Sequence, residues 1–137
     1  MAGAPTIIAQ GVPCQIVSYP GWSLPTRVRL VADITGGAAV VRAADSTPGV
    51  SCGAGAGGVF DITFPQAQRM ADVNPQVFST VPGTNANRFL GVVDVSTTNT
   101  NPTTGKLRVV TAVPNAAAAI PDNGAVFDVS FWVDYGK

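Results

Sequence analysis

Apolar and polar residues alternate along much of the chain with the two-residue period of a half-buried β-strand. In residues 26–34 the polar face carries Arg27, Arg29 and Asp33, and the apolar face carries Val28, Leu30, Ala32 and Ile34. In residues 125–133 the apolar face carries Phe127, Val129, Phe131 and Val133. One face of each of these strands is therefore expected in the core.

Eight segments are predicted as strands, because each is short, rich in Val, Thr or Phe, and bounded by turn-forming residues. They are residues 12–18, 26–34, 38–44, 59–64, 77–81, 90–97, 106–113 and 125–133. Gly36 and Gly37 suit the positive φ angles of a tight hairpin, so the second and third segments should pair antiparallel. The sixth and seventh should form a hairpin around the long polar tract 98–105.

Helix is expected almost nowhere, because the chain contains 15 Gly and 11 Pro. Residues 66–72 are predicted to form one helical turn, which Pro75 would end. The Ala-rich residues 116–119 lie between two prolines and are expected to connect strands.

The pattern as a whole predicts an all-β fold, an antiparallel β-sandwich or jelly roll with about eight strands and little or no helix. A single domain is expected over residues 1–137, with residues 1–11 as an extended N-terminal arm. Two strands carry nearly the same string, VFDITF at 59–64 and VFDVSF at 126–131. This similarity fits an internal half-repeat, and it fits equally two unrelated strands with one apolar face each.

Charge is scarce in this sequence. Charged residues make up 12% of the chain, about half of the usual share, and the formal net charge is zero. A neutral surface favours association over dispersal. We therefore interpret the chain as a subunit of an assembly; the alternative is a monomer with a surface of Ser, Thr and Asn.

The sequence contains no His and no Glu, so the commonest general base is missing. A Ser or Cys nucleophile would have no His beside it. The chain is therefore predicted to be non-enzymatic, with no catalytic residue, no cofactor and no metal site. Two alternatives stay open: a carboxylate pair drawn from Asp61, Asp94 and Asp128, and a Ca²⁺ site built from loop oxygens.

Residues 53–58 satisfy the string G-x-G-x-x-G, but that phosphate-binding motif needs a helix after the glycines, and here a strand follows. A flexible loop or a close backbone approach is favoured over nucleotide binding. Cys14 and Cys52 are expected to be free buried thiols, with a disulfide as the alternative in an oxidising compartment. The N-terminus lacks a signal-peptide pattern, and no apolar run reaches membrane length, so synthesis in a cytoplasm without export is expected.

Arg27 and Arg29 form the only basic cluster, which predicts a solvated polar face rather than nucleic-acid binding. The remaining candidate interface or binding residues are aromatic: Tyr19, Trp22, Trp132 and Tyr135. Such aromatics are either covered by their own chain or placed against a partner.

Four strings in the second part of the chain resemble the small β-sandwich modules of tailed-phage virions, which include capsid decoration proteins, tail-fibre tips and H-type lectin-like domains. They are GVFDITFPQ at 58–66, NPQVFSTV at 74–81, VVDVSTTNTNPTTGKLRVV at 92–110 and VFDVSFWVDYGK at 126–137. Residues 1–57 have no counterpart in the family. The ending Trp132-Val133-Asp134-Tyr135 departs from its usual Trp-Ile-Ala-like ending.

The resemblance implies a virion protein that is made in the host cytoplasm and works as an oligomer, typically a homotrimer. Its partners would be copies of itself and the major capsid protein or another virion protein, with no nucleic acid and no membrane. Because the chain is nearly all globular, a capsid decoration or minor capsid protein is favoured. The alternative is a tail-fibre tip or lectin-like module that recognises surface glycans, although the resemblance assigns glycan binding to no residue.

Overall fold

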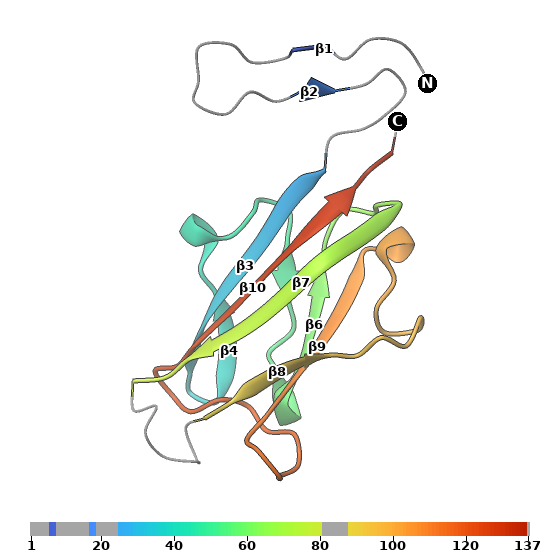
Figure 1. Ribbon diagram of the computed structural model, residues 1–137. Helices are drawn as coiled ribbons and strands as arrows, with labels where there is room; N and C mark the ends of the chain where they lie inside the picture. The colour runs from blue at the N-terminus through green and yellow to red at the C-terminus, as the bar shows by residue number, and fades with distance from the viewer. Residues whose placement is uncertain (1–5, 8–16, 19–24, 81–87, 137) are drawn as a thin grey trace.

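The structure is a computed structural model that describes residues 6–7, 17–18, 25–80 and 88–136. Two antiparallel sheets of four strands each pack face to face as a β-sandwich (Figure 1). One sheet has the strand order β4-β3-β10-β7, and the other has the order β5-β6-β9-β8. We call them the β10 sheet and the β9 sheet. The all-β sandwich expected from the alternation is thereby confirmed.

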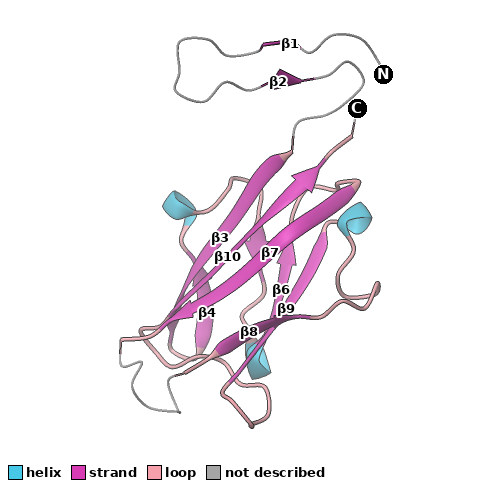
Figure 2. Ribbon diagram, viewed as in Figure 1, coloured by secondary structure: helices cyan, strands magenta, loops and turns pink. Residues whose placement is uncertain are grey.

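The elements of the sandwich are short apart from three long strands of the β10 sheet. That sheet contains β3 (Thr26–Thr35), β4 (Ala38–Val41), β7 (Arg69–Phe78) and β10 (Val126–Asp134). The β9 sheet contains β5 (Ser51–Cys52), β6 (Val59–Thr63), β8 (Leu90–Val93) and β9 (Lys106–Ala112). Helical structure within the described ranges is limited to three single turns (Figure 2), which are η1 (Ala43–Asp45), η2 (Ala56–Gly58) and η4 (Pro102–Thr104).

The predicted N-terminal segments are described only in part. β1 (Thr6–Ile7) and β2 (Val17–Ser18) pair antiparallel in a separate two-stranded sheet. The rest of the predicted strand 12–18 and of the arm 1–11 lies outside the described residues, and the arm stays a prediction.

The core lies between the two sheets and is filled by the predicted apolar faces. Phe60 of β6 stacks on Phe127 of β10, with ring centroids 4.2 Å apart. Phe64, just after β6, meets Phe131 of β10 edge to face at 5.0 Å. These rings hold the same positions in the strings VFDITF and VFDVSF, so the two similar strings face each other from opposite sheets.

The expected turns form as the sequence indicates. Gly36 and Gly37 have φ angles of 61° and 78° and join β3 to β4 as an antiparallel hairpin. The predicted hairpin of β8 and β9 is antiparallel as well. At the turn before β10, the Asn123 side-chain oxygen accepts a hydrogen bond from the Gly37 N–H at 3.0 Å, and Gly124 donates to the Ile34 carbonyl at 2.9 Å. These hydrogen bonds connect the turn between β3 and β4 to the turn before β10.

The prediction for residues 66–81 is wrong. A single strand, β7, replaces the helical turn and the short strand, and it runs through Pro75. Pro75 is tolerated because β7 is an edge strand, where an N–H on the open side needs no partner strand. The pairing of β7 with β10 shifts by one residue near Asp72, whose φ is 53°. Because of this bulge the core-facing Met70 and Val73 are three residues apart. This is the spacing expected for neighbouring residues on one face of a helix.

The glycine string 53–58 makes a close backbone approach, as predicted. Gly58 is buried with a φ of 77°, and a Cβ there would lie 2.5 Å from the Ala119 carbonyl oxygen and 2.6 Å from that of Thr111. The fully buried Thr111 hydroxyl donates to the same Ala119 oxygen at 2.8 Å. The connecting segment 116–119 is therefore held against β9 and the glycine string.

We predict that Gly58→Ala destabilises the protein more than Gly57→Ala does. Both glycines have positive φ, which costs an L-residue about 1 kcal/mol, but a Cβ at Gly57 would meet nothing within 4 Å. The overlap at Gly58 should lower the free energy of unfolding by at least about 2 kcal/mol more, measured by urea denaturation. Equal losses in the two variants would contradict the close approach.

Candidate interaction surfaces

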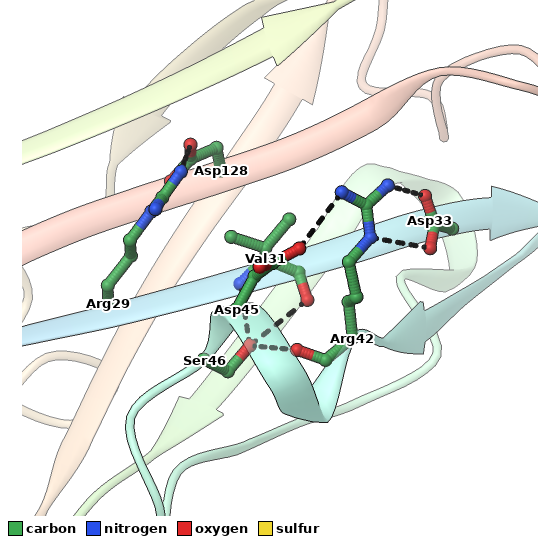
Figure 3. Close-up of polar contacts among 7 residues, drawn as sticks. All are labelled: Arg29, Val31, Asp33, Arg42, Asp45, Ser46 and Asp128. Atoms are coloured by element: carbon green, nitrogen blue, oxygen red, sulfur yellow. Dashed lines mark hydrogen bonds and ion pairs between the residues drawn. The ribbon is translucent and has the colours of Figure 1, made fainter.

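The outer face of the β10 sheet carries ion pairs (Figure 3). Arg29 of β3 donates to both carboxylate oxygens of Asp128 on β10, at 2.8 and 3.2 Å. Arg42 in the same way binds Asp33 and also reaches Asp45 at 3.2 Å. The hydrogen bonds from Arg42 lower the pKa of the Asp33 carboxyl below its ordinary value. Ion pairs this exposed add little stability, but they leave the charges on this face largely matched.

Residues 42–47, part of which was predicted as strand, cap the edge of β3 where β4 ends (Figure 3). The Ser46 hydroxyl accepts a hydrogen bond from the Val31 N–H at 2.9 Å, and the Arg42 N–H donates to the Val31 carbonyl at 2.7 Å. The Thr47 hydroxyl accepts a hydrogen bond from the Arg29 N–H at 2.9 Å, and the Thr47 N–H donates to the Arg29 carbonyl at 2.8 Å. Val31 is only 2% exposed although it points to the outer face. This stretch of β3 therefore has no free edge for another strand.

We predict that Ser46→Ala lowers the free energy of unfolding by about 1 to 3 kcal/mol, because it leaves the buried Val31 N–H without its acceptor. Ser51→Ala is the matched control, since Ser51 lies exposed on β5 and its loss should change the free energy by less than about 0.5 kcal/mol. Urea denaturation followed by circular dichroism measures both. A Ser46→Ala variant as stable as the control would show that the cap does not hold this edge.

The predicted binding aromatics divide into two groups. Trp132 lies on the outer face of β10, is 38% exposed, and stands opposite Arg27 on β3 and Ala71 on β7. Tyr135 follows the end of β10 and is similarly exposed. Tyr19 and Trp22 lie outside the described residues. The structure thus brings Trp132 and Tyr135 to the same end of β10, and their role in an interface stays a prediction.

The outer face of the β9 sheet is different in character, because two adjacent cross-strand rows on it are entirely apolar. Strand pairing places these side chains in register on β8, β9, β6 and the connecting segment after β9. One row is Val92, Val110 and Val59, and the next row is Leu90, Ala112 and Ala118. We call these six residues the apolar patch.

The candidate residues named from the sequence did not include this patch. Its signal was present as paired apolar neighbours, Val92-Val93 on β8 and Val109-Val110 on β9, where the alternation gives way to apolar residues on both faces. Strands with two apolar faces are typical of burial on both sides. Here the inward members pack on the core, whereas Val92 is 63% exposed.

A charged row borders the patch. Arg108 of β9 donates to both oxygens of Asp61 on β6, at 2.6 and 3.0 Å. Asp94, on the other side of Arg108, accepts hydrogen bonds from the Ser96 N–H and the Asn99 side chain, which lower the pKa of its carboxyl. An open groove beside this row has a volume of about 180 Å³, smaller than typical ligand pockets of about 300 to 1,000 Å³.

The three candidate carboxylates do not include the acid–base pair that a glycosidase needs. Asp128 lies on the outer face of the β10 sheet, and Asp61 lies on the outer face of the β9 sheet. Asp61 and Asp94 share a sheet face, with Arg108 between them. A glycosidase acid needs a raised pKa, whereas the pKa of Asp94 is lowered. Within the described ranges no three Asp or Cys side chains gather into a metal-binding group, and no helix there is long and apolar enough to cross a membrane.

Cys52 carries a free thiol that is largely buried under the β9 sheet edge. Burial and the nearby charge of Asp61 raise the pKa of this thiol to about 12. The thiolate is the reactive form, so Cys52 is expected to be inert at neutral pH. The free thiol expected for Cys52 is thus found, whereas Cys14 lies outside the described residues and its state stays a prediction.

We predict slow modification of Cys52 by a disulfide reagent in a Cys14→Ser variant. Near pH 8 the folded protein should react at least about 100-fold more slowly than free cysteine, whose thiol has a pKa of about 8.5. Because burial raises the pKa, the rate should keep rising with pH above about 9 instead of levelling there. Unfolding in urea should restore the rate of free cysteine. Rapid reaction of the folded protein would show that the thiol is accessible and ionised.

The described chain thus contains an eight-stranded antiparallel β-sandwich, with ion pairs on the outer face of the β10 sheet and the apolar patch on the outer face of the β9 sheet. Comparison with protein-family models, curated protein sequences and solved structures finds no significant match to this chain.

Proposed function

We propose that the chain is a non-enzymatic viral structural protein, a capsid decoration or minor capsid protein that acts as an oligomer on the virion. The observation that carries this proposal is the apolar patch on the outer face of the β9 sheet. Contiguous exposed apolar surface on a small domain is typical of a protein–protein contact. The patch supports a role in assembly over a role as a free carrier or catalyst.

The distribution of charge supports the same proposal. Arg29, Arg42 and Arg108 each bind a carboxylate of their own chain, and the net charge is zero. Contacts between subunits of such a protein would rely on apolar packing and backbone hydrogen bonds rather than on charge attraction.

The sequence resemblance supports the virion context. The four strings that resemble tailed-phage modules contain β6 and β10 whole and parts of β7, β8 and β9. They include both core aromatic pairs and one row of the apolar patch, which is Val92, Val110 and Val59. The exposed apolar rows of the β9 sheet offer a decoration protein an adhesive surface.

The decisive experiment mixes the purified protein with undecorated shells of the virus that encodes it. We expect saturable binding in a sedimentation assay, and a higher temperature of shell disruption after binding, because the protein bridges shell subunits. Shells that already carry the protein are the control and should bind no more of it. Absence of binding together with an unchanged disruption temperature would refute the proposal.

A glycan-binding module is the second candidate, and the exposure of Trp132 is the observation that favours it. An aromatic ring that lies open on a sheet face beside Arg27 offers a stacking surface and a hydrogen-bond donor to a sugar. Specific signals on a glycan array that are lost in Trp132→Ala or Trp22→Ala would favour this candidate over the decoration protein.

A further inference from the structure

The turn before β10 contains the only Asn-Gly pair of the sequence, Asn123-Gly124. An asparagine loses its side-chain amide when the backbone nitrogen of the next residue attacks the asparagine Cγ atom. Glycine has no Cβ, so it hinders this attack least and gives the chain the most freedom to bring the two atoms together. The other asparagines are followed by Ala, Arg, Thr or Pro, which hinder or block the attack.

The folded chain holds both reacting groups of this pair in hydrogen bonds. The Gly124 N–H, which must lose its proton before the nitrogen attacks, donates to the Ile34 carbonyl at 2.9 Å. The Asn123 side-chain oxygen accepts from the Gly37 N–H at 3.0 Å, which fixes the amide against the neighbouring turn. A backbone N–H that is bound in this way is protected from deprotonation until its hydrogen bond opens. The native turn therefore opposes the reaction.

These hydrogen bonds lie where the sandwich opens most easily. Asn123, Gly124 and Gly37 are all exposed. The bond from Gly124 lies just beyond Val126 and Asp33, the terminal pair of the ladder between β10 and β3. Exposed hydrogen bonds at the end of a ladder open with a much lower free energy than those in the core. The Asn-Gly pair therefore becomes reactive without unfolding of the whole sandwich.

We propose that Asn123-Gly124 is a latent deamidation site, which the hydrogen bonds to Gly37 and Ile34 keep unreactive until the turn opens. In the open turn the Gly124 nitrogen loses its proton to solvent and forms a bond to Cγ of Asn123. The bond from Cγ to the amide nitrogen breaks, and ammonia leaves with a proton taken from water, so a succinimide ring remains. Water then opens the ring, at Cγ to give aspartate or at the backbone carbonyl to give isoaspartate. The reaction needs no partner, so it is independent of the function proposed for the chain.

The two products affect the turn differently. Aspartate keeps a side-chain oxygen in place of the amide oxygen, so the Gly37 N–H retains its acceptor. Isoaspartate adds one carbon to the backbone directly before Gly124, so the Gly124 N–H no longer matches the Ile34 carbonyl. Formation of isoaspartate therefore disconnects the turn before β10 from the hairpin of β3 and β4.

The test ages the purified chain at mildly alkaline pH, with and without guanidinium chloride, and locates the deamidated residue by mass spectrometry of its peptides. In the denaturant, Asn123 should deamidate faster than any other asparagine. In the folded protein it should react at least about tenfold more slowly, because the open turn is a minor population. This slowing should be at least as large as the protection of the Gly124 amide from hydrogen exchange, since both processes need the same hydrogen bond to open.

Two variants separate the chemistry from the fold. Asn123→Gln keeps an amide but would have to form a larger ring, so deamidation at this position should disappear in the denatured chain. Asn123→Asp reproduces the aspartate product and should melt within about 2 °C of the fresh protein. The isoaspartate form, separated by chromatography after ageing, should melt at least about 4 °C below Asn123→Asp, because it loses backbone hydrogen bonds of the turn.

Equal rates of deamidation in the folded and the denatured chain would overturn the proposal, because the hydrogen bonds would then give no protection. Faster deamidation at another asparagine of the denatured chain would overturn it as well. An isoaspartate form that melts together with Asn123→Asp would also count against it, since the turn would then tolerate the longer backbone.

Discussion

The stacking of Phe60 on Phe127 across the two sheets is the contact on which the arrangement of the molecule depends. Together with the second pair, Phe64 and Phe131, it fixes how β6 lies against β10. Because side chains alternate along a strand, fixing the inward rings also fixes which residues point outward. Asp61 and Asp128 follow Phe60 and Phe127 directly, so each carboxylate emerges on the outer face of its own sheet, where an arginine of a neighbouring strand binds it.

The sequence predicts best those strands whose inward residues are strictly two apart. β3, β6 and β10 satisfy this rule over their whole length, and their ends lie within about two residues of the predicted ones. β7 breaks it at the bulge near Asp72, where the spacing of core residues changes from two to three. A one-residue insertion of this kind is stabilised by the pairing with β10, which is a contact between distant parts of the chain. Local periodicity therefore cannot reveal it.

The candidate interaction surfaces could also be predicted from the sequence only in part. The outward position of Trp132 follows from the phase of β10 alone, and the structure confirms that position. The apolar patch depends instead on register, since Val59, Val92 and Val110 become one row only when β6, β9 and β8 pair as they do. Each of these valines by itself is an unremarkable surface residue. They form an apolar surface only together with their neighbours on the adjacent strands, and the local sequence pattern does not reveal which residues those neighbours are.

The two outer faces impose an orientation on any assembly of this protein. On the β10 sheet, Arg29 and Arg42 are held by carboxylates, and residues 42–47 cap the edge of β3. This face also exposes apolar side chains, Val40 at 55% and Phe78 at 52%, but they lie in a row with Asp33. On the β9 sheet, Val92 and Leu90 remain exposed without any polar group among their row partners. Burial of apolar surface is the main free-energy source of association, whereas breaking paired charges opposes it. In the assembly that we propose, the apolar patch is therefore the surface expected to be buried, whereas burial of the β10 sheet would have to cover or break its ion pairs.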